Sequence, residues 1–378
     1  MIPASLYIHI PWCIRKCPYC DFNSHKSPDV LPETQYIRAL VADLKQDVAR
    51  FGIRPLHSIF IGGGTPSLLS AEAYTLLFDE IRRILPFALD IEITLEANPG
   101  TVEQGRFKDY RAIGINRLSL GIQSFNPKHL QRLGRIHDEK QAHHAIDNAR
   151  QAGFDNINID IMHGLPQQSI AECIADLREG LAHEPEHLSW YQLTIEPNTV
   201  FYKTQPNLPT EDDAYLMEKE GFSLLQTNDY HRYEISAFSK QNKQSMHNLN
   251  YWLFGDYYGI GAGAHGKLTT LDCKKIYRTR KHRQPIDYLD STKPFLAEVN
   301  NINERELLFE FMLNTTRLEE PIKKSLFIER TGLPETEITD LLKVAEDQKL
   351  IRCTETTWQI TAFGRRFTND LQALFLPN

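Results

Sequence analysis

The chain has 378 residues, of which 41% are hydrophobic and 24% charged, enough for one large globular domain and a smaller one. Its net charge of −7 disfavours nucleic acid as the main partner, because phosphate binding needs a basic excess. The N-terminus MIPASLYIHIPWC lacks the regions of a secretion signal, and no apolar run approaches the ~18 residues of a membrane helix, so we expect a soluble, cytoplasmic protein that is not an integral membrane protein.

Six short strand-like segments, each followed by a helix-like segment, dominate the first half of the chain. They are rich in Ile and Leu, as strands covered on both faces are, and span residues 5–10, 57–63, 90–98, 117–123, 157–164 and 188–195. Capping-box spacing marks three helix starts, at Thr101 with Gln104, Asp138 with Gln141 and Ser169 with Glu172. Six β-then-α units predict an α/β fold with a parallel sheet, open or curled into part of a barrel. Its chemistry is expected at the carboxyl ends of the strands.

Two further regions follow residues 1–200, which hold these units. Residues 201–295 are predicted to be an elaboration of the barrel with a helix over 212–227, a strand over 232–238 and glycine-rich loops. Residues 296–378 resemble a small α+β winged helix, with helices at about 303–315, 321–331 and 336–349, a hairpin around 352–360 and a last helix. From Phe295 onward, ten Lys and Arg stand against fourteen Asp and Glu, a net of −4. Since DNA affinity depends on basic charge, a packing or docking module is favoured over a DNA-binding one.

Three of the six cysteines stand close together in PWCIRKCPYCDF (11–22). The spacing is C-x3-C-x2-C, formed by Cys13, Cys17 and Cys20. Pro18 pushes the preceding cysteine away from the helical region, so the thiols should come from a loop after the first strand. In a chain without a secretion signal, such a group indicates metal binding in a reducing compartment.

Two metal centres compete for these thiols. Structural zinc needs four ligands, and His9 or His25 could supply the fourth. An iron–sulfur cubane is normally held by four thiolates, so three would leave one iron open. The neighbours Trp12, Tyr19 and Phe22 would shield a cluster from water. The spacing favours the cluster over zinc, with free thiols as a third alternative.

Small or polar residues also stand at the ends of later strands. GGGTP (62–66) follows the second strand and lacks the Lys of a phosphate loop, so it either lets the backbone touch a ligand or forms only a tight turn. Asp160 lies among Ile neighbours, where a carboxylate needs a hydrogen-bonding partner such as ribose hydroxyls. Further candidates, each of which could equally be a salt-bridge or capping residue, are Glu96, Gln123 and Arg135.

The cysteine motif resembles that of the radical S-adenosylmethionine (SAM) superfamily, and YIHIPWC resembles its oxygen-independent coproporphyrinogen III oxidase family. The resemblance spans nearly the whole chain and implies a partial (β/α)6 TIM-like barrel. It implies a 4Fe-4S cluster held by the three cysteines, with SAM chelating the open iron. GGGTP would bind the methionine end of SAM, and Glu96 and Arg135 the amino acid portion. The SAM-binding residues that it implies are Tyr7, Tyr19, Gly63, Gly64, Thr65, Glu96, Gln123, Arg135, Asp160 and Gln192.

The chain departs from the oxidases in three respects. They carry a further cysteine where this chain has Phe22, and an N-terminal extension, whereas here the first cysteine is residue 13. HNLNYW (247–252) resembles the signature of the HemW branch, whose members act as heme chaperones. These departures favour a chaperone over an active oxidase.

HNLNYW offers chemistry suited to heme. His247 could ligate heme iron through a neutral imidazole nitrogen, and Tyr251 and Trp252 could stack on the porphyrin. Without the resemblance, a histidine packed on core aromatics would be the better interpretation. The basic stretch KKIYRTRKHR (274–283) could pair with heme propionates or an acidic partner, or form a solvated surface loop. GIGAGAHG (259–266) is predicted to close the cofactor pocket, with His265 as a weaker heme-ligand candidate.

Three functions follow, in order of preference. The first is a chaperone that binds heme, a 4Fe-4S cluster and SAM, and passes heme to acceptor hemoproteins such as respiratory enzymes; a homodimer is plausible by family analogy. The second is a radical enzyme that decarboxylates porphyrinogen propionates. The third is a zinc-binding regulator with a DNA-binding C-terminal module, which the acidic charge of that region disfavours.

Overall fold

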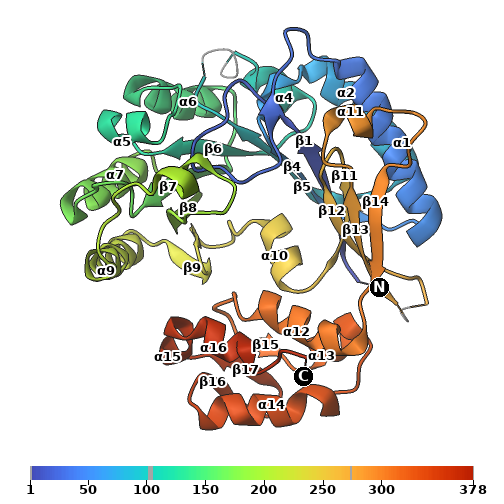
Figure 1. The fold of residues 1–378 in the computed structure, drawn as a ribbon, viewed down its shortest axis with the longest axis vertical. Coiled ribbons are helices and arrows are strands. Elements are labelled where there is room, and N and C mark those ends of the chain that lie inside the picture. Colours follow the sequence, from blue (N-terminus) through green and yellow to red (C-terminus); the bar gives the residue numbers. More distant parts are fainter. Residues whose placement is uncertain (1, 101–104, 273–274, 378) are drawn as a thin grey trace.

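The computed structural model describes residues 2–100, 105–272 and 275–377, and a single large sheet organises most of them (Figure 1). Its strand order is β14-β13-β12-β11-β1-β4-β5-β6-β7-β8-β10-β9. From β11 to β8 neighbouring strands run parallel, and antiparallel strands extend both edges. The bounds are β1 Ala4–Ile10, β4 Leu56–Gly63, β5 Phe87–Ala97, β6 Arg117–Gln123, β7 Ile157–His163, β8 His187–Gln192, β9 His231–Glu234, β10 Ala237–Ser239, β11 Asp256–Ile260, β12 His265–Thr269, β13 Ile276–Lys281 and β14 Leu296–Asn301. Among the described residues β14 and β9 are not bonded to each other, so the sheet is a partial barrel, as predicted.

Helices cover the outer face of the parallel strands (Figure 1). Those in the first half of the chain connect successive parallel strands, and the remainder belong to the elaboration after β8. Their bounds are α1 Glu33–Phe51, the 3-10 turn η1 Pro66–Leu68, α2 Ala71–Ile84, α4 Phe107–Ala112, α5 Pro127–Arg132, α6 Glu139–Gln151, α7 Ile170–Ala182, α8 Val200–Thr204, α9 Glu211–Thr227, α10 Met246–Trp252 and α11 Pro285–Tyr288.

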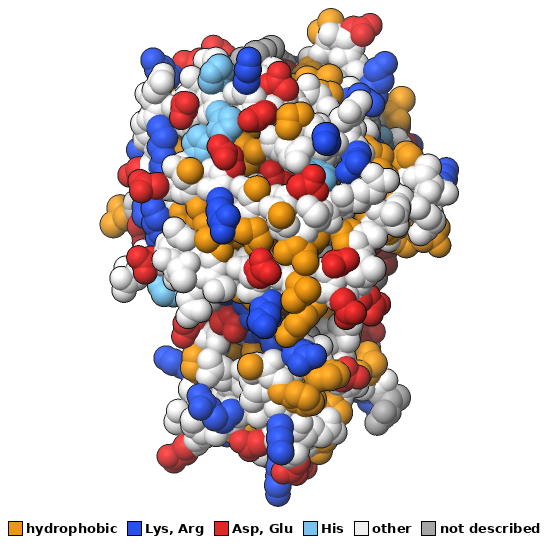
Figure 2. All heavy atoms as spheres, turned by 90° about the vertical axis from the view of Figure 1, so that its left-hand side faces the viewer, with side chains coloured by type: hydrophobic (Ala, Val, Ile, Leu, Met, Phe, Trp, Pro, Cys, Tyr) orange, Lys and Arg blue, Asp and Glu red, His pale blue; other side chains and the backbone are white. Residues whose placement is uncertain are grey.

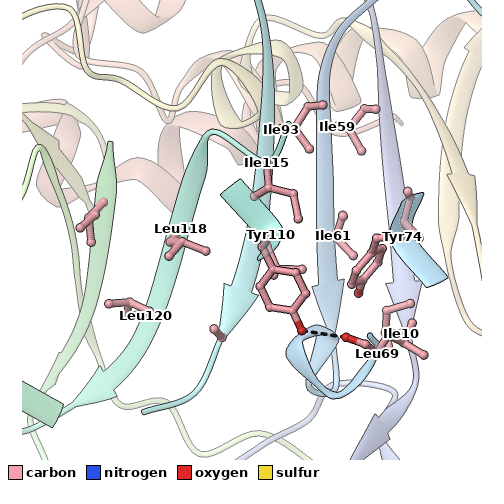
Figure 3. Close-up of a cluster of buried hydrophobic side chains, with 14 of the residues drawn as sticks. Ile10, Ile59, Ile61, Leu69, Tyr74, Ile93, Tyr110, Ile115, Leu118 and Leu120 are labelled. Atoms are coloured by element: carbon pink, nitrogen blue, oxygen red, sulfur yellow. Dashed lines mark hydrogen bonds between the residues drawn. The ribbon is translucent and has the colours of Figure 1, made fainter. Parts of the chain in front are cut away.

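The main hydrophobic core lies between the sheet and these outer helices (Figure 3). Alternate strand residues such as Ile61 and Leu118 point outward to meet Tyr74 of α2 and Tyr110 of α4, and all four are fully buried. The Tyr110 hydroxyl donates a 2.7 Å hydrogen bond to the carbonyl of Leu69, which fixes α4 against the turn after β4. Burial of these apolar side chains stabilises the strands, and the ends of the strands carry the polar residues described below.

The opposite, inner face of the barrel is lined by polar side chains. Near the amino ends of the strands, the hydroxyls of Ser5 and Ser58 lie 2.7 Å apart, and His187 Nδ1 lies 2.6 Å from Asn158 Oδ1. All four side chains are buried and have polar partners, so the interior is a hydrogen-bonded network there.

A second hydrophobic cluster organises the C-terminal region, which packs below the amino ends of the barrel strands in Figure 1. Phe311, Phe327 and Trp358 are among its buried members, and Phe254 joins it from the preceding region. The elements are α12 Glu304–Thr315, β15 Ile322–Lys323, α13 Ser325–Thr331, α14 Thr336–Asp347, β16 Ile351–Cys353, β17 Thr357–Ile360, α15 Ala362–Arg366 and α16 Thr368–Ala373. The helices α12 and α14 and the hairpin of β16 and β17 lie where they were predicted. The helix predicted over 321–331 is wrong in its first part, because β15 occupies it and adds a third strand to the hairpin.

Comparison with the predicted elements shows both agreement and error. All six predicted parallel strands are present, and the capping boxes at Asp138 and Ser169 are confirmed; the pair Thr101 and Gln104 lies outside the described residues. The strand predicted over 232–238 is wrong, because a turn divides it into the antiparallel strands β9 and β10. The prediction of glycine-rich loops in this region is also partly wrong, because β11 is a seventh parallel strand beside β1.

Candidate functional site

The three clustered cysteines lie on a non-helical loop directly after β1, as predicted. Cys13 ends the short strand β2 (Trp12–Cys13), which pairs with β3 (His25–Lys26) and closes the base of the loop. Between them the backbone turns, with the Cys20 amide donating to the Cys17 carbonyl at 3.2 Å. The loop therefore presents all three thiols, each partly exposed, at the carboxyl end of the barrel.

Burial makes two of these thiols weak acids without a bound metal. It raises the pKa of Cys13, although the Thr65 hydroxyl opposes this shift by donating to the sulfur at 3.5 Å. It also raises the pKa of Cys20 to about 11. Among the described residues no three His, Cys, Asp or Glu side chains converge closely enough to hold one metal ion.

A pocket of about 440 Å³ opens beside the cysteine loop, inside the carboxyl end of the barrel. All of the predicted SAM-binding residues except Tyr7 line it, together with the three cysteines. The strands β4 to β8 and the loops after β1 and β4 each contribute. The structure thus brings together residues that lie up to 179 positions apart in the sequence, from Cys13 to Gln192.

Two of the carboxyl groups that line the pocket, Glu96 and Asp160, are buried there. Burial and the nearby Asp160 raise the pKa of Glu96 to about 8, while a 3.1 Å hydrogen bond from the Gly63 amide opposes the shift. Burial raises the pKa of Asp160 as well, although its oxygens accept bonds from Asn158 Nδ2 at 2.8 Å and Ser119 Oγ at 3.2 Å. Among the described residues neither carboxyl forms a salt bridge, so a cationic ligand would provide the missing charge.

Arg135 links the pocket wall to the cysteine loop. Its guanidinium donates to Asn98 Oδ1 at 2.7 Å, to the carbonyl of Gly121 at 2.6 Å and to Cys17 Sγ at 3.6 Å. Asn98, which also donates to the Thr65 hydroxyl at 3.2 Å, is a lining residue that the sequence analysis missed. Its position directly after β5 is the feature that could have identified it.

Tyr7 and Gln123 hold the pocket in different ways. The Tyr7 hydroxyl lies 2.9 Å from His9 Nδ1, and His9 Nε2 lies 2.8 Å from the carbonyl of Asn23, so Tyr7 supports the cysteine loop from below rather than lining the pocket. Gln123 accepts a 2.8 Å bond from the hydroxyl of Tyr191, a second lining residue that the sequence analysis missed.

The HNLNYW segment forms helix α10 at the opposite, amino end of the barrel (Figure 1). Glu92 of β5 accepts hydrogen bonds from the amides of Met246 and His247 at 3.2 Å each and from the Ser245 hydroxyl at 3.4 Å. A carboxylate at a helix N-terminus is favourable for both hydrogen bonding and charge. These hydrogen bonds to Glu92 fix α10 at the end of the barrel.

His247 points from α10 into the barrel and is 2% exposed. Its Nδ1 lies 3.0 Å from the Ser58 hydroxyl, and its ring lies between those of Phe60 (5.1 Å) and Tyr251 (4.9 Å). Burial lowers the pKa of His247 to about 3, so the imidazole is neutral. Its Nε2 makes no hydrogen bond to the described residues.

The other two heme candidates are half-buried beside His247. The Tyr251 ring lies 4.2 Å from that of Tyr257, and the Trp252 ring carries the Arg317 guanidinium at 4.1 Å. These three candidates form one group, but they lie at the other end of the barrel from the cysteines.

The interpretation of the basic stretch 274–283 as a solvated loop is wrong for its described part. It forms strand β13, and Lys281 is fully buried between Asp43 (2.5 Å) and Asp47 (2.8 Å). Arg278 is paired with Glu310 at 2.6 Å. Both cations stabilise the fold through ion pairs with carboxylates of the chain.

The glycine-rich run 259–266 does not close the pocket, contrary to the prediction. No residue of the run lines it, and His265 is exposed outside it at the start of β12. Instead, Gly259 lets β11 and β12 lie very close together, because a Cβ there would lie 1.9 Å from the carbonyl oxygen of His265. The run therefore serves the sheet rather than a ligand.

The chemistry of the pocket fits a cluster and SAM. Three thiols at its mouth supply the soft ligands that iron–sulfur clusters take, and the paired carboxyls behind them suit a ligand with positive charge and hydroxyl groups. Gly64 lets the turn after β4 pack closely against the backbone before the cysteine loop, since a Cβ there would lie 2.5 Å from the Trp12 carbonyl oxygen. The glycine therefore fixes the position of this turn beside the cysteine loop.

Comparison with known proteins gives a consistent result. Residues 7–179 match the Radical SAM superfamily, and residues 302–367 match the HemN C-terminal domain. The chain is 49% identical to the heme chaperone HemW of Haemophilus influenzae and 48% identical to that of Escherichia coli, covering 99% of this chain and 98% of each relative. The heme chaperone HemW of Bacillus subtilis is 33% identical over 98% of this chain and 99% of its own length.

The same architecture occurs in a solved structure. Coproporphyrinogen III oxidase (HemN) from Escherichia coli, a radical SAM enzyme, superimposes with a TM-score of 0.82 at 22% identity, covering 99% of this chain and 90% of that chain. In the described part of the chain, every helix is too short or too polar to cross a bilayer.

Proposed function

This chain belongs to the HemW family of the radical SAM superfamily, and we propose that it is a heme chaperone that holds a 4Fe-4S cluster and SAM in the barrel pocket and delivers heme to acceptor hemoproteins. Respiratory-chain enzymes are the acceptors that we expect. The observation that carries the heme proposal is the state of His247, whose imidazole is neutral and whose Nε2 lacks a hydrogen-bond partner.

A heme ligand requires these two properties of a histidine. The ring must be neutral for one nitrogen to offer a lone pair, and the other nitrogen is usually held by a hydrogen bond that orients the ring. In His247 the Ser58 hydroxyl holds Nδ1 at 3.0 Å, which leaves Nε2 as the donor atom. Because His247 is 2% exposed, heme reaches Nε2 only after neighbouring side chains move aside.

In the pocket, Cys13, Cys17 and Cys20 would hold the cluster. A cluster with one open iron supplies a one-electron donor and an anchor for the amino and carboxylate groups of SAM. Glu96 would face the positive charge of SAM, and Asp160 would accept hydrogen bonds from its ribose hydroxyls. Arg135 would hold the Cys17 sulfur as it does here, at 3.6 Å.

The completeness of this pocket also supports a second candidate function, radical decarboxylation of a porphyrinogen. Against it stands Phe22, which is 57% exposed at the pocket mouth where the oxidases carry a further cysteine. Formation of 5′-deoxyadenosine and of a decarboxylated porphyrinogen under reducing conditions would promote this candidate over the chaperone.

The test of the chaperone proposal is a hemin titration of anaerobically reconstituted protein, followed by the Soret absorbance. Wild type should bind hemin stoichiometrically, and His247→Ala should bind it at least about tenfold more weakly, with an altered Soret band. His57→Ala, which removes an exposed histidine at the start of β4, is the matched control and should bind like wild type. Failure of wild type to bind hemin would refute the proposal, whereas equal binding by His247→Ala would remove only this ligand.

A further inference from the structure

A seam joins the barrel elaboration to the C-terminal region next to α10. Strand β9 meets the segment after α12 there, through a bridge between Glu234 and Leu318 and a 3.1 Å bond from the Glu319 amide to the Tyr233 carbonyl. Trp252, the last residue of α10, lies at this seam, because Arg317 of the same segment covers its ring at 4.1 Å. The end of the heme-motif helix is therefore in contact with the seam.

Arginines from separate segments gather along this seam. Glu319 forms salt bridges with Arg232 at 2.7 Å and with Arg365 at 3.1 Å, and Glu234 accepts a hydrogen bond from Arg317 at 3.2 Å. We call Arg232, Arg317 and Arg365 the waist arginines. The next residue, Arg366, is exposed and lies over the ring of Tyr215 at 5.9 Å.

The seam carries more positive than negative charge. Three glutamates, Glu234, Glu319 and Glu218, face these four arginines, which leaves an excess of one positive charge in a chain with a net charge of −7. Figure 2 shows Lys and Arg side chains beside hydrophobic ones at the waist between the two parts of the molecule. Such a local excess attracts an anion.

Polar groups at Trp252 remain without an acceptor. Its indole Nε1 and the Nε of Arg317 are both shielded from water and make no hydrogen bond to the described residues. Arg317 is still accessible, with 30% of its side chain exposed, and it has donors beyond the single bond to Glu234. An anionic group that enters beside Trp252 would satisfy donors that the protein leaves open.

We propose that the waist arginines, Arg317 foremost, bind the propionate carboxylates of the heme whose iron is ligated by α10. This inference rests on the proposed chaperone function. Heme is a flat apolar molecule with two carboxylates at one edge, so it needs an aromatic surface and cations next to it. Trp252 and Arg317 provide this combination 4.1 Å apart, and the planar guanidinium suits a carboxylate well.

The alternative cations nearby are less suited to this role. Arg278 is held by a 2.6 Å bond to the Tyr257 hydroxyl, and Glu310 accepts two further hydrogen bonds from it. Lys281 is completely buried between two aspartates. Arg330, which is also near α10, donates its Nε to the carbonyl of Leu253 at 3.1 Å. Of these cations, Arg317 has its guanidinium over an aromatic ring of α10.

The experiment compares hemin with hemin dimethyl ester, which lacks the carboxylates, in the same dilute detergent. Full-length reconstituted protein is titrated as wild type, Arg317→Gln, Arg317→Lys and, as a matched control, Arg352→Gln, which removes an exposed arginine of β16. Arg317→Gln should weaken hemin binding about tenfold and leave binding of the ester unchanged. Arg317→Lys should recover part of the hemin affinity, and Arg352→Gln should behave like wild type.

The outcomes separate this inference from the function on which it rests. Equal losses for hemin and its ester in Arg317→Gln would assign Arg317 a structural role and overturn the inference. Unchanged hemin binding would overturn it too, and would leave an acidic protein segment as the better occupant of the waist. If wild type binds neither compound, the chaperone function itself fails. Thermal unfolding of each variant shows whether it remains folded.

Discussion

Replacing Glu96 by glutamine should stabilise the ligand-free protein increasingly as the pH rises. Burial beside Asp160 raises the pKa of Glu96 from 4.5 to about 8, so near neutral pH the folded state holds a proton that the unfolded chain has released. Stability therefore falls as the pH rises through this window. From about pH 6 to about pH 8, the difference between the two pKa values lowers the free energy of unfolding of wild type by about 2 kcal/mol. If water in the pocket screens half of the effect, the decrease is about 1 kcal/mol.

The assay is urea unfolding of cluster-free Glu96→Gln and wild type at both pH values. The variant does not titrate at this position, so its advantage should grow by about 1–2 kcal/mol from the lower to the higher pH. Glu72→Gln, which alters an exposed carboxyl in the first turn of α2, should show no such growth. An advantage that is the same at both pH values would refute the reasoning.

Once the cluster and SAM are bound, we expect wild type to be more stable than Glu96→Gln. An ionised Glu96 then faces a cationic ligand, so SAM at about 100 times its Kd should stabilise wild type by about 2.7 kcal/mol. Glu96→Gln should gain much less. Such an exchange of stability for binding is usual where a site keeps an unpaired buried charge.

Two further predictions concern the frame of the pocket. Gly64→Ala should lower the unfolding free energy by about 1–3 kcal/mol and weaken SAM binding measured by calorimetry, because the added methyl group meets a backbone carbonyl that cannot rotate away; unchanged SAM affinity would contradict this. Lys281→Met should cost about 3–5 kcal/mol in urea unfolding near pH 7, since it leaves two buried aspartates unpaired, and less at lower pH where they take up protons. Lys275→Met, at an exposed position just before β13, is its control and should stay within about 0.5 kcal/mol of wild type.

The parallel strands were predictable because each is buried on its outer face by closely spaced aliphatic residues. Ile157–His163, for instance, alternates Ile with residues that point into the barrel, and both its start and its type follow from that pattern. The strand β11 escaped notice because its sequence DYYGI contains a glycine and adjoins a glycine run. Only the tertiary structure reveals that Gly259 sits in a strand where two backbones nearly touch.

The candidate site was predictable to the extent that parallel strands converge. Glu96 and Asp160 stand at or near strand ends, and once the strands are known their meeting at one end of the barrel follows. Asn98 and Tyr191 were missed because their roles depend on partners, Arg135 and Gln123, that are distant in sequence. Spacing alone cannot supply such a partner.

The position of α10 could not be inferred from its sequence, and it bears on how the two proposed ligands relate. The cysteines and Glu96 lie at the carboxyl end of the barrel. Glu92, four residues before Glu96 on β5, accepts hydrogen bonds from the amides of Met246 and His247 at the other end. A porphyrin at α10 would therefore not lie against the SAM pocket. A radical enzyme needs its substrate next to the cofactor, because reacting atoms must come close together. A carrier has no such requirement, so the proposed heme site at α10 agrees with a chaperone and would not suit an oxidase that bound its substrate there.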